Sequence, residues 1–244
     1  MDARRWMGVA AAVALATGCT ATSGSGDDAA GTPPPTAAES SVEATQSQEA
    51  LDAALRASIV KGEPYEVAAA VDAGADLDSR GPGRDTPLHL ATMLGDAEKV
   101  ELLLEKGAVP DSRMLNGDAA LHIAARGQFH DVIEALIAGG AIATIGAGYE
   151  WASTPIHQSA LVGDVDGMKI FLAHGATIED RSPGYEGTPL LYAVWAGHRD
   201  AVAWLLAQGA DATATTESGS GAIKIARDTD HEDLIPMLKE AGAS

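Results

Sequence analysis

The sequence predicts an all-α protein: a solenoid of about six helix–turn–helix repeats joined by protruding loops. Two observations predict this fold. A short two-helix pattern recurs at nearly constant spacing, and a Gly-Ala pair closes every copy. Only 4% of the residues are aromatic, which suits close packing of helices. Because one two-helix unit cannot bury its apolar faces alone, the copies must stack on one another.

The pattern is most complete in residues 86–108. Thr86 has a side-chain oxygen suited to capping a helix, and proline is favoured at the first helical position, so a first helix is expected over Pro87–Met93. Gly95 begins the turn to a second helix with one apolar face. Gly107 can adopt the left-handed conformation that ends such a helix.

A hydrophobic marker residue near the start of each copy sets the period of the repeat. It recurs as Leu55, Leu88, Leu121, Ile156, Leu190 and Ile223. The steps between markers are 33, 33, 35, 34 and 33 residues, and a Gly-Ala pair begins 19 residues after each one. The two-helix core therefore has a fixed length, and all variation in length lies in the connecting loops. Repeats of this kind stack in one dimension.

The second copy, Thr86-Pro87-Leu88-His89, and the fourth, Thr154-Pro155-Ile156-His157, resemble the ankyrin repeat family. The third copy lacks the Thr-Pro pair, and the fifth has Leu191 in place of the histidine. The first and sixth copies are degenerate and polar, as expected of capping repeats with one face in water. The resemblance covers residues 48–244 and implies finger loops, which protrude between the repeats.

The N-terminus resembles the export signal of a bacterial lipoprotein. An apolar run of 11 residues, Trp6–Ala16, follows a basic start and is too short to span a bilayer. It leads into Leu15-Ala16-Thr17-Gly18-Cys19, which is similar to a lipobox. We expect residues 1–18 to be a signal peptide and Cys19, the sole cysteine, to be lipidated. The alternative is an ordinary signal peptide, cut after Ala16, that leaves Cys19 free.

Residues 19–47 are expected to form a disordered tether. The segment after Cys19 is rich in Ala, Ser, Thr and Gly and contains acidic but no basic side chains. The expected location is the bacterial envelope. Because Thr20 rather than aspartate follows Cys19, an outer membrane facing the periplasm is favoured over an inner one. The net charge of −19 disfavours nucleic acid and anionic lipid, so the membrane is contacted through the anchor only.

The sequence offers no set of residues for catalysis, metal binding or a cofactor. His89, His122 and His157 occur once per repeat, and neighbouring helices lie about 8–10 Å apart, which is too far for convergence on one zinc ion. The family resemblance implies that these histidines instead join the finger loops by hydrogen bonds. Phosphate-binding and nucleophile motifs are also missing from the sequence. We therefore expect no enzymatic activity.

The resemblance places a protein partner on the concave face of the first helices and on the finger loops. The repeat phase assigns a stripe of partner-binding positions: Met93, Leu94, Leu115, Arg126, Trp151, Leu161, Tyr185 and Trp195. Arg113 and Arg181 are expected to flank it. Exposed aromatic and arginine side chains are common anchors of protein interfaces. Two alternatives stay open: Trp151 and Tyr185 could stiffen the loops by packing together, and Trp195 could be wedged between repeats.

The expected function is that of a non-catalytic, monomeric scaffold in the cell envelope that binds another protein. Two alternatives share the fold. One is a periplasmic factor that protects enzymes under stress. The other is a released effector that binds a protein of a host or competitor.

Overall fold

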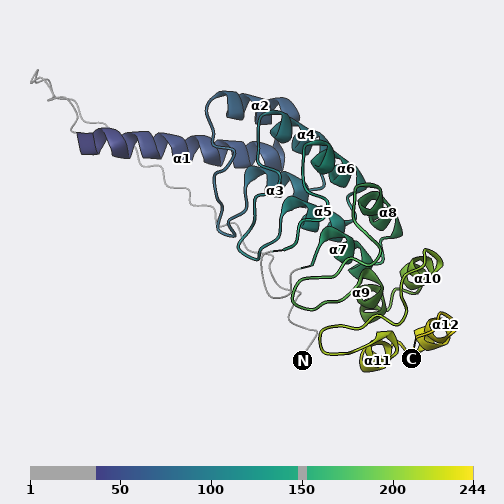
Figure 1. Cartoon of the computed structure of the whole chain (residues 1–244). Coiled ribbons are helices and arrows are strands. Elements are labelled where there is room, and N and C mark those ends of the chain that lie inside the picture. The colour runs from purple at the N-terminus through teal and green to yellow at the C-terminus, as the bar shows by residue number, and fades with distance from the viewer. Residues whose placement is uncertain (1–36, 148–152, 244) are drawn as a thin grey trace, which may run out of the picture.

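The computed structural model describes residues 37–147 and 153–243. Over these ranges the chain is a curved stack of helix pairs, with no strand beyond one isolated bridge between Thr215 and Gly221. Figure 1 shows the first helices in an inner row, the second helices in an outer row, and the loops on the side away from the outer row. The predicted all-α solenoid is confirmed.

The inner row holds the first helix of each repeat: α1 (Ala37–Lys61), α3 (Pro87–Met93), α5 (Ala120–Gly127), α7 (Pro155–Leu161), α9 (Pro189–Ala196) and α11 (Ala222–Asp228). The outer row holds the second helices: α2 (Pro64–Asp72), α4 (Ala97–Glu105), α6 (His130–Ala138), α8 (Val165–Ala173), α10 (Arg199–Ala207) and α12 (Ile235–Glu240). A 3-10 turn, Glu232–Leu234, precedes α12.

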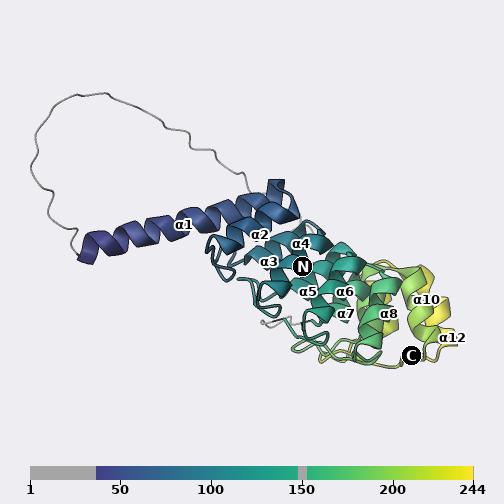
Figure 2. The same ribbon diagram turned by 90° about the horizontal axis from the view of Figure 1, so that it is seen from above.

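Helix α1 begins earlier than the sequence analysis expected. The tether was expected to extend to residue 47, but α1 begins at Ala37 and is 25 residues long. Part of the segment assigned to the tether is thus helical, and Figure 2 shows α1 extending beyond the stack. Alanine and glutamate are frequent in this segment and are good helix formers, so local propensity extends the helix beyond its packing partners.

The glycines that close the repeats take the backbone conformation that the sequence predicts. Their φ angles lie between +90° and +99° at Gly74, Gly107, Gly140, Gly175, Gly209 and Gly242. In the third repeat, Gln128 replaces the glycine that turns the chain between the two helices, yet it also has a positive φ of +57°. Glutamine tolerates this left-handed conformation at some energetic cost.

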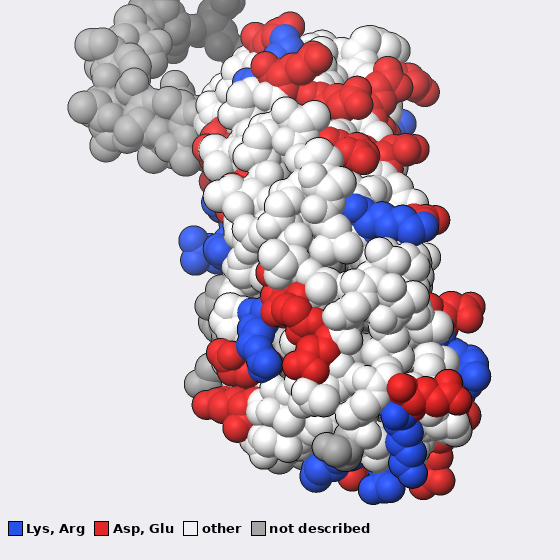
Figure 3. All heavy atoms as spheres, turned by 45° about the vertical axis from the view of Figure 1, so that its right-hand side comes forward, with Lys and Arg blue, Asp and Glu red and all other residues white. Residues whose placement is uncertain are grey.

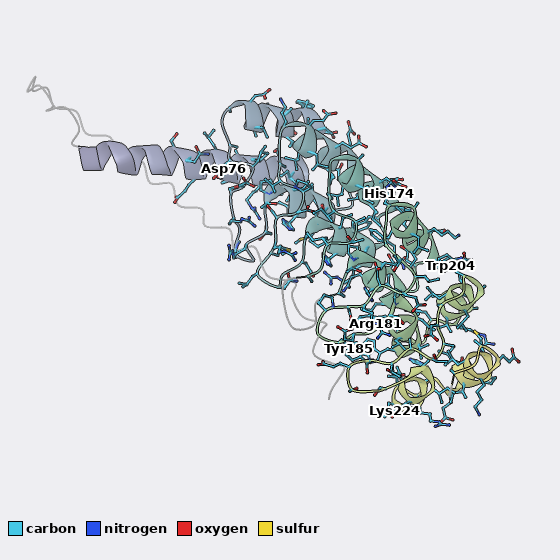
Figure 4. All side chains as sticks on the ribbon, in the orientation of Figure 1. Asp76, His174, Arg181, Tyr185, Trp204 and Lys224 are labelled. Atoms are coloured by element: carbon cyan, nitrogen blue, oxygen red, sulfur yellow. The ribbon has the colours of Figure 1, made fainter. Side chains whose placement is uncertain are left out.

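The core lies between the two rows of helices and runs the length of the stack. The six marker residues are its regular component, and each of their side chains is at most 5% exposed. Phe171 is a large, fully buried side chain, and Trp204 packs against the core from α10 (Figure 4). Burial of each such side chain stabilises the fold by about 1.5–3 kcal/mol, so the row of markers holds the repeats together.

Candidate partner-binding surface

Five finger loops connect the repeats, and each is closed at its base by a backbone hydrogen bond. The fingers are residues 81–85, 114–118, 147–153, 182–187 and 216–220, numbered 1 to 5, and their closing N–H···O distances are 2.9–3.1 Å. Finger 3 has two more residues than fingers 1, 2 and 5. This difference matches the 35-residue step from Leu121 to Ile156, which is two residues longer than the steps of 33.

Buried histidines join the inner helices to the fingers. His122 Nε2 lies 2.9 Å from the carbonyl of Ser153, and His157 Nε2 lies 3.0 Å from the carbonyls of both Asp180 and Gly187. Because a carbonyl can only accept, Nε2 carries the proton in both rings. Nδ1 then accepts from a backbone N–H at the start of the same helix, at 3.2–3.3 Å.

His89 occupies the same position but its Nε2 does not complete this contact. The ring is fully buried, and Nδ1 lies 2.8 Å from the Thr86 hydroxyl. Burial lowers the pKa of His89, and the carbonyls of Asp118 and Ser112 only partly offset this effect; Nε2 has no hydrogen bond to either carbonyl. Burial is the largest influence on all three rings and lowers the pKa of each, to about 4 for His157.

Arg56 takes the place of the histidine in the first repeat. The sequence analysis grouped it with side chains of a solvated end, but it is mostly buried and paired with the Asp85 carboxylate. Its Nη1 also donates to the Asp85 carbonyl at 3.2 Å, which is the contact that the histidines make in later repeats. A charged side chain therefore serves the same scaffold role where the repeat meets solvent.

Three arginines connect neighbouring fingers from the outside. Each Nη1 donates to a carbonyl of its own loop and to a carbonyl of the next loop: Arg80 to Arg84 and Arg113, Arg113 to Gly117 and Gly146, and Arg181 to Glu186 and Thr215. We call these side chains the arginine rungs. Figure 4 labels Arg181 beside α9. Arg113 and Arg181, expected to flank the partner stripe, thus make scaffold contacts.

Gly146 stands where finger 3 would carry the next rung. Its carbonyl accepts from Arg113, but a glycine has no side chain that can donate to the following finger. The longest finger and the missing guanidinium therefore coincide in one repeat.

Four apolar positions of the predicted stripe are exposed in the structure. The exposed fractions are 41% for Met93, 48% for Leu94, 57% for Leu115 and 50% for Trp195, while Leu161 is half-buried. Met93, Leu161 and Trp195 lie at or near the ends of the inner helices α3, α7 and α9. Trp195 is therefore not fully wedged between repeats. Isolated apolar side chains at a surface are common, but a row at one repeat position needs a reason.

Tyr185 does not stand alone on its finger. Its ring packs edge-on against Tyr192 of α9 at 5.9 Å, and Tyr192 in turn packs edge-on against His157 at 4.9 Å. Burial raises the pKa of both tyrosines. Tyr185 therefore has a stiffening role in finger 4 through its contact with Tyr192. The sequence analysis did not identify Tyr192. Its position two residues after the marker Leu190 is the signal that could have placed it on the first helix of the fifth repeat.

Arg126 is the basic member of the stripe and is held on two sides. Nη2 lies 2.6 Å from Oδ2 of Asp118 at the base of finger 2, and Nη1 lies 3.4 Å from Oε1 of Gln158 on α7. The Arg126 side chain is 43% exposed. Its two partners went unnoticed in the sequence, although aspartate recurs three residues before the marker, as Asp85 and Asp118.

Two expected functional residues, Cys19 and Trp151, lie outside the described residues. Among those that the structure does describe, no three His, Cys, Asp or Glu side chains come close enough together to hold a metal ion. Within the same ranges, none of the helices has the length and apolar content needed to cross a membrane.

The outer row of helices presents a different, acidic surface. Two shallow grooves flank α4, one towards α2 and one towards α6, and both are lined by Glu101 and Glu105. Figure 3 shows acidic side chains gathered at the upper end of this face. The sequence analysis did not include this face in the partner stripe, and acidic side chains exposed on one helix face are well solvated.

Comparison with known proteins identifies the family. The model of the family "Ankyrin repeats (3 copies)" matches residues 55–146 and 142–216, which together exceed half of the chain. The chain belongs to the ankyrin repeat family, and such repeats form protein-binding scaffolds.

Two solved structures share this architecture. The human ASB11 ankyrin repeat domain is 24% identical to this chain, with a TM-score of 0.68. The match covers 78% of this chain and 84% of the ASB11 domain. The ankyrin repeat domain of Bcl-3, a member of the IkappaB protein family, is 28% identical to this chain, with a TM-score of 0.67. The match covers 78% of this chain and 86% of the Bcl-3 domain. No curated protein matches the chain significantly.

The buried histidines should make stability depend on pH. The pKa of His157 falls from 6.5 to about 4 in the folded chain, so between these values the unfolded state binds more protons. The free energy of unfolding should therefore decrease as the pH falls from about 6.5 to 4, by up to about 3 kcal/mol for this residue. Urea unfolding at several pH values should show a shallower loss for His157→Gln. An unchanged pH dependence in this variant would contradict the assignment.

Adding the missing rung should stabilise the stack. At Gly146 a new Cβ would meet only the Pro183 side chain, at an ordinary 3.7 Å. Gly146→Arg should therefore fit and donate to the next finger, raising the free energy of unfolding by about 0.5–1.5 kcal/mol over Gly146→Ala. The alanine variant controls for the lost flexibility of glycine in the unfolded chain. Equal stability of the two variants in urea titrations would show that no rung forms.

Proposed function

We propose that this chain is a non-catalytic scaffold that is exported, held at the bacterial envelope by a lipid on Cys19, and binds another protein through its concave face and finger loops. The observation that carries the binding proposal is the exposed apolar side chains of Met93 and Trp195, which occupy the same position of the second and fifth repeats, with half-buried Leu161 at that position of the fourth. Scaffold contacts do not require Met93, Leu94 or Trp195 to be apolar, because their side chains are about half exposed.

The surroundings of these side chains support the same assignment. Buried histidines and arginine rungs hold the fingers, so the surface beside the stripe is preorganised. A rigid surface loses less conformational entropy on binding, which favours affinity. Large side chains presented by such a surface are suited to act as interface anchors.

The envelope location rests on the sequence of the first 19 residues. A basic start, an 11-residue apolar run and a lipobox-like segment precede the sole cysteine. Two acyl chains or more on Cys19 would anchor the protein stably. An outer membrane facing the periplasm is the proposed site, with a monomeric solenoid held away from the membrane surface.

Removing the aromatic anchors should abolish partner capture. Cells that express the wild type or the double variant Trp151→Ala, Trp195→Ala would be crosslinked intact, and the captured proteins quantified. The double variant should recover at least tenfold less partner, because buried interface tryptophans contribute about 2 kcal/mol or more each. Its melting temperature should stay within a few degrees of the wild type.

Tyr65→Ala is the matched control, because Tyr65 is a 72% exposed aromatic outside the stripe. This control should capture partner as the wild type does. Undiminished capture by the double variant would reject the stripe as the binding surface. A collapse of its helical circular dichroism would assign the tryptophans to the scaffold.

The lipid anchor has its own test. In bacteria that process lipoproteins, the wild type should incorporate radiolabelled palmitate and sediment with membranes, whereas Cys19→Ser should do neither, because it lacks the acylated thiol. Thr20→Ser serves as the control and should behave as the wild type. A wild-type protein that is exported but remains unlabelled and soluble would point to the ordinary signal peptide instead.

A further inference from the structure

Arg126 gives the apolar stripe a charged centre. The residue five positions after the marker is Met93 in the second repeat, Leu161 in the fourth and Trp195 in the fifth, but it is Arg126 in the third. The stripe therefore has apolar side chains on both sides of one guanidinium. Nothing in the repeat pattern demands arginine at this position.

The guanidinium is held in place by neighbours that are themselves well buried. Asp118 and Gln158 are 6% and 8% exposed. The Asp118 carboxylate that binds Arg126 also accepts from Asn116 Nδ2 at 2.9 Å, so its position is fixed by finger 2. Arg126 thus bridges a finger loop and α7, and little freedom of its head group remains to be lost on binding.

Arg126 still has donors to offer. A guanidinium carries five N–H groups, and the bonds to Asp118 and Gln158 engage one at each terminal nitrogen. With the side chain 43% exposed, the remaining donors can meet a ligand from the concave side. The acceptor that matches a guanidinium in shape and charge is a carboxylate, which can take two parallel hydrogen bonds.

We propose that the part of the stripe formed by Met93, Arg126, Leu161 and Trp195 recognises an extended segment of a partner protein in which one aspartate or glutamate is flanked by apolar residues. This inference rests on the proposed function and adds the chemistry of the bound segment. Inner helices of neighbouring repeats lie about 8–10 Å apart, and an extended chain rises about 3.3 Å per residue. The acidic residue should therefore lie about three residues from an apolar residue on each side.

The overall charge makes this preference a sharp test. A chain with a net charge of −19 repels acidic peptides at long range, so general electrostatics would select basic peptides. A preference for an acidic residue at one position can then come only from a local group. Asp118 offsets part of the charge of Arg126, and we therefore expect about fivefold to tenfold discrimination between a carboxylate and its amide.

The experiment is selection of a random peptide library on the purified full chain and on two variants. The wild type should enrich peptides with Asp or Glu about three residues from apolar side chains. Arg126→Gln should keep the apolar preference and lose the acidic one. Lys239→Gln removes the same charge from α12, outside the stripe, and should select as the wild type does. Circular dichroism and melting curves confirm that each variant is folded.

The binding affinity of one selected peptide then tests whether its acidic residue interacts with Arg126. Replacing its acidic residue by the amide should weaken binding to the wild type about fivefold to tenfold and leave binding to Arg126→Gln unchanged. Arg126→Lys keeps the charge but lacks the planar fork, so it should retain only part of the preference.

Failure of the inference differs from failure of the proposed function. Selected peptides that need Trp195 but show no acidic preference, or a preference that survives in Arg126→Gln, would overturn the inference and leave the stripe as the binding surface. Peptides that bind Trp195→Ala as well as the wild type, or the absence of any enriched peptide, would overturn both.

Discussion

Hydrogen bonds from one repeat to the finger carbonyls of the next are the constraint on which the rest of this structure depends. The backbone N–H and C=O groups of a finger loop have no partners within a helix. Each such group that is buried without a hydrogen bond destabilises the fold by about 1–3 kcal/mol. His122 and His157 donate to finger carbonyls from the inner helices, and the arginine rungs donate to finger carbonyls from the loops themselves. The neutral state of the histidines follows, because burial disfavours their charged form.

Because the scaffold uses these polar side chains, only the remaining exposed side chains are available to bind a partner. Arg113 and Arg181 looked like interface residues by their type and position, but both donate to carbonyls of two fingers. Tyr185 likewise packs on Tyr192. The exposed side chains that the scaffold does not require, such as Met93, Leu94 and Trp195, are apolar and lie at the ends of inner helices.

The periodic features of the fold could be predicted from the sequence because they repeat. Six Gly-Ala pairs at a constant distance from the markers fixed the helix ends, and α3 has the predicted bounds, Pro87–Met93. The start of α1 could not be found in this way, because no second copy of that segment exists for comparison. The repeat phase also assigned the stripe, but it could not identify the partners of Arg113 or Arg126. These contacts join residues between 4 and 33 positions apart, and they depend on side-chain geometry that a sequence pattern does not contain.

Several irregularities fall in the third repeat and the finger that follows it. Finger 3 is longer than its neighbours and is preceded by Gly146, which cannot supply a rung to finger 4. The repeat that precedes this finger has the exposed Arg126 where the second, fourth and fifth repeats have an apolar residue. A selection for scaffold stability alone would favour the regular finger and the rung. Departures of this kind within one repeat and its following finger fit a region at which recognition, rather than packing, determines the residues.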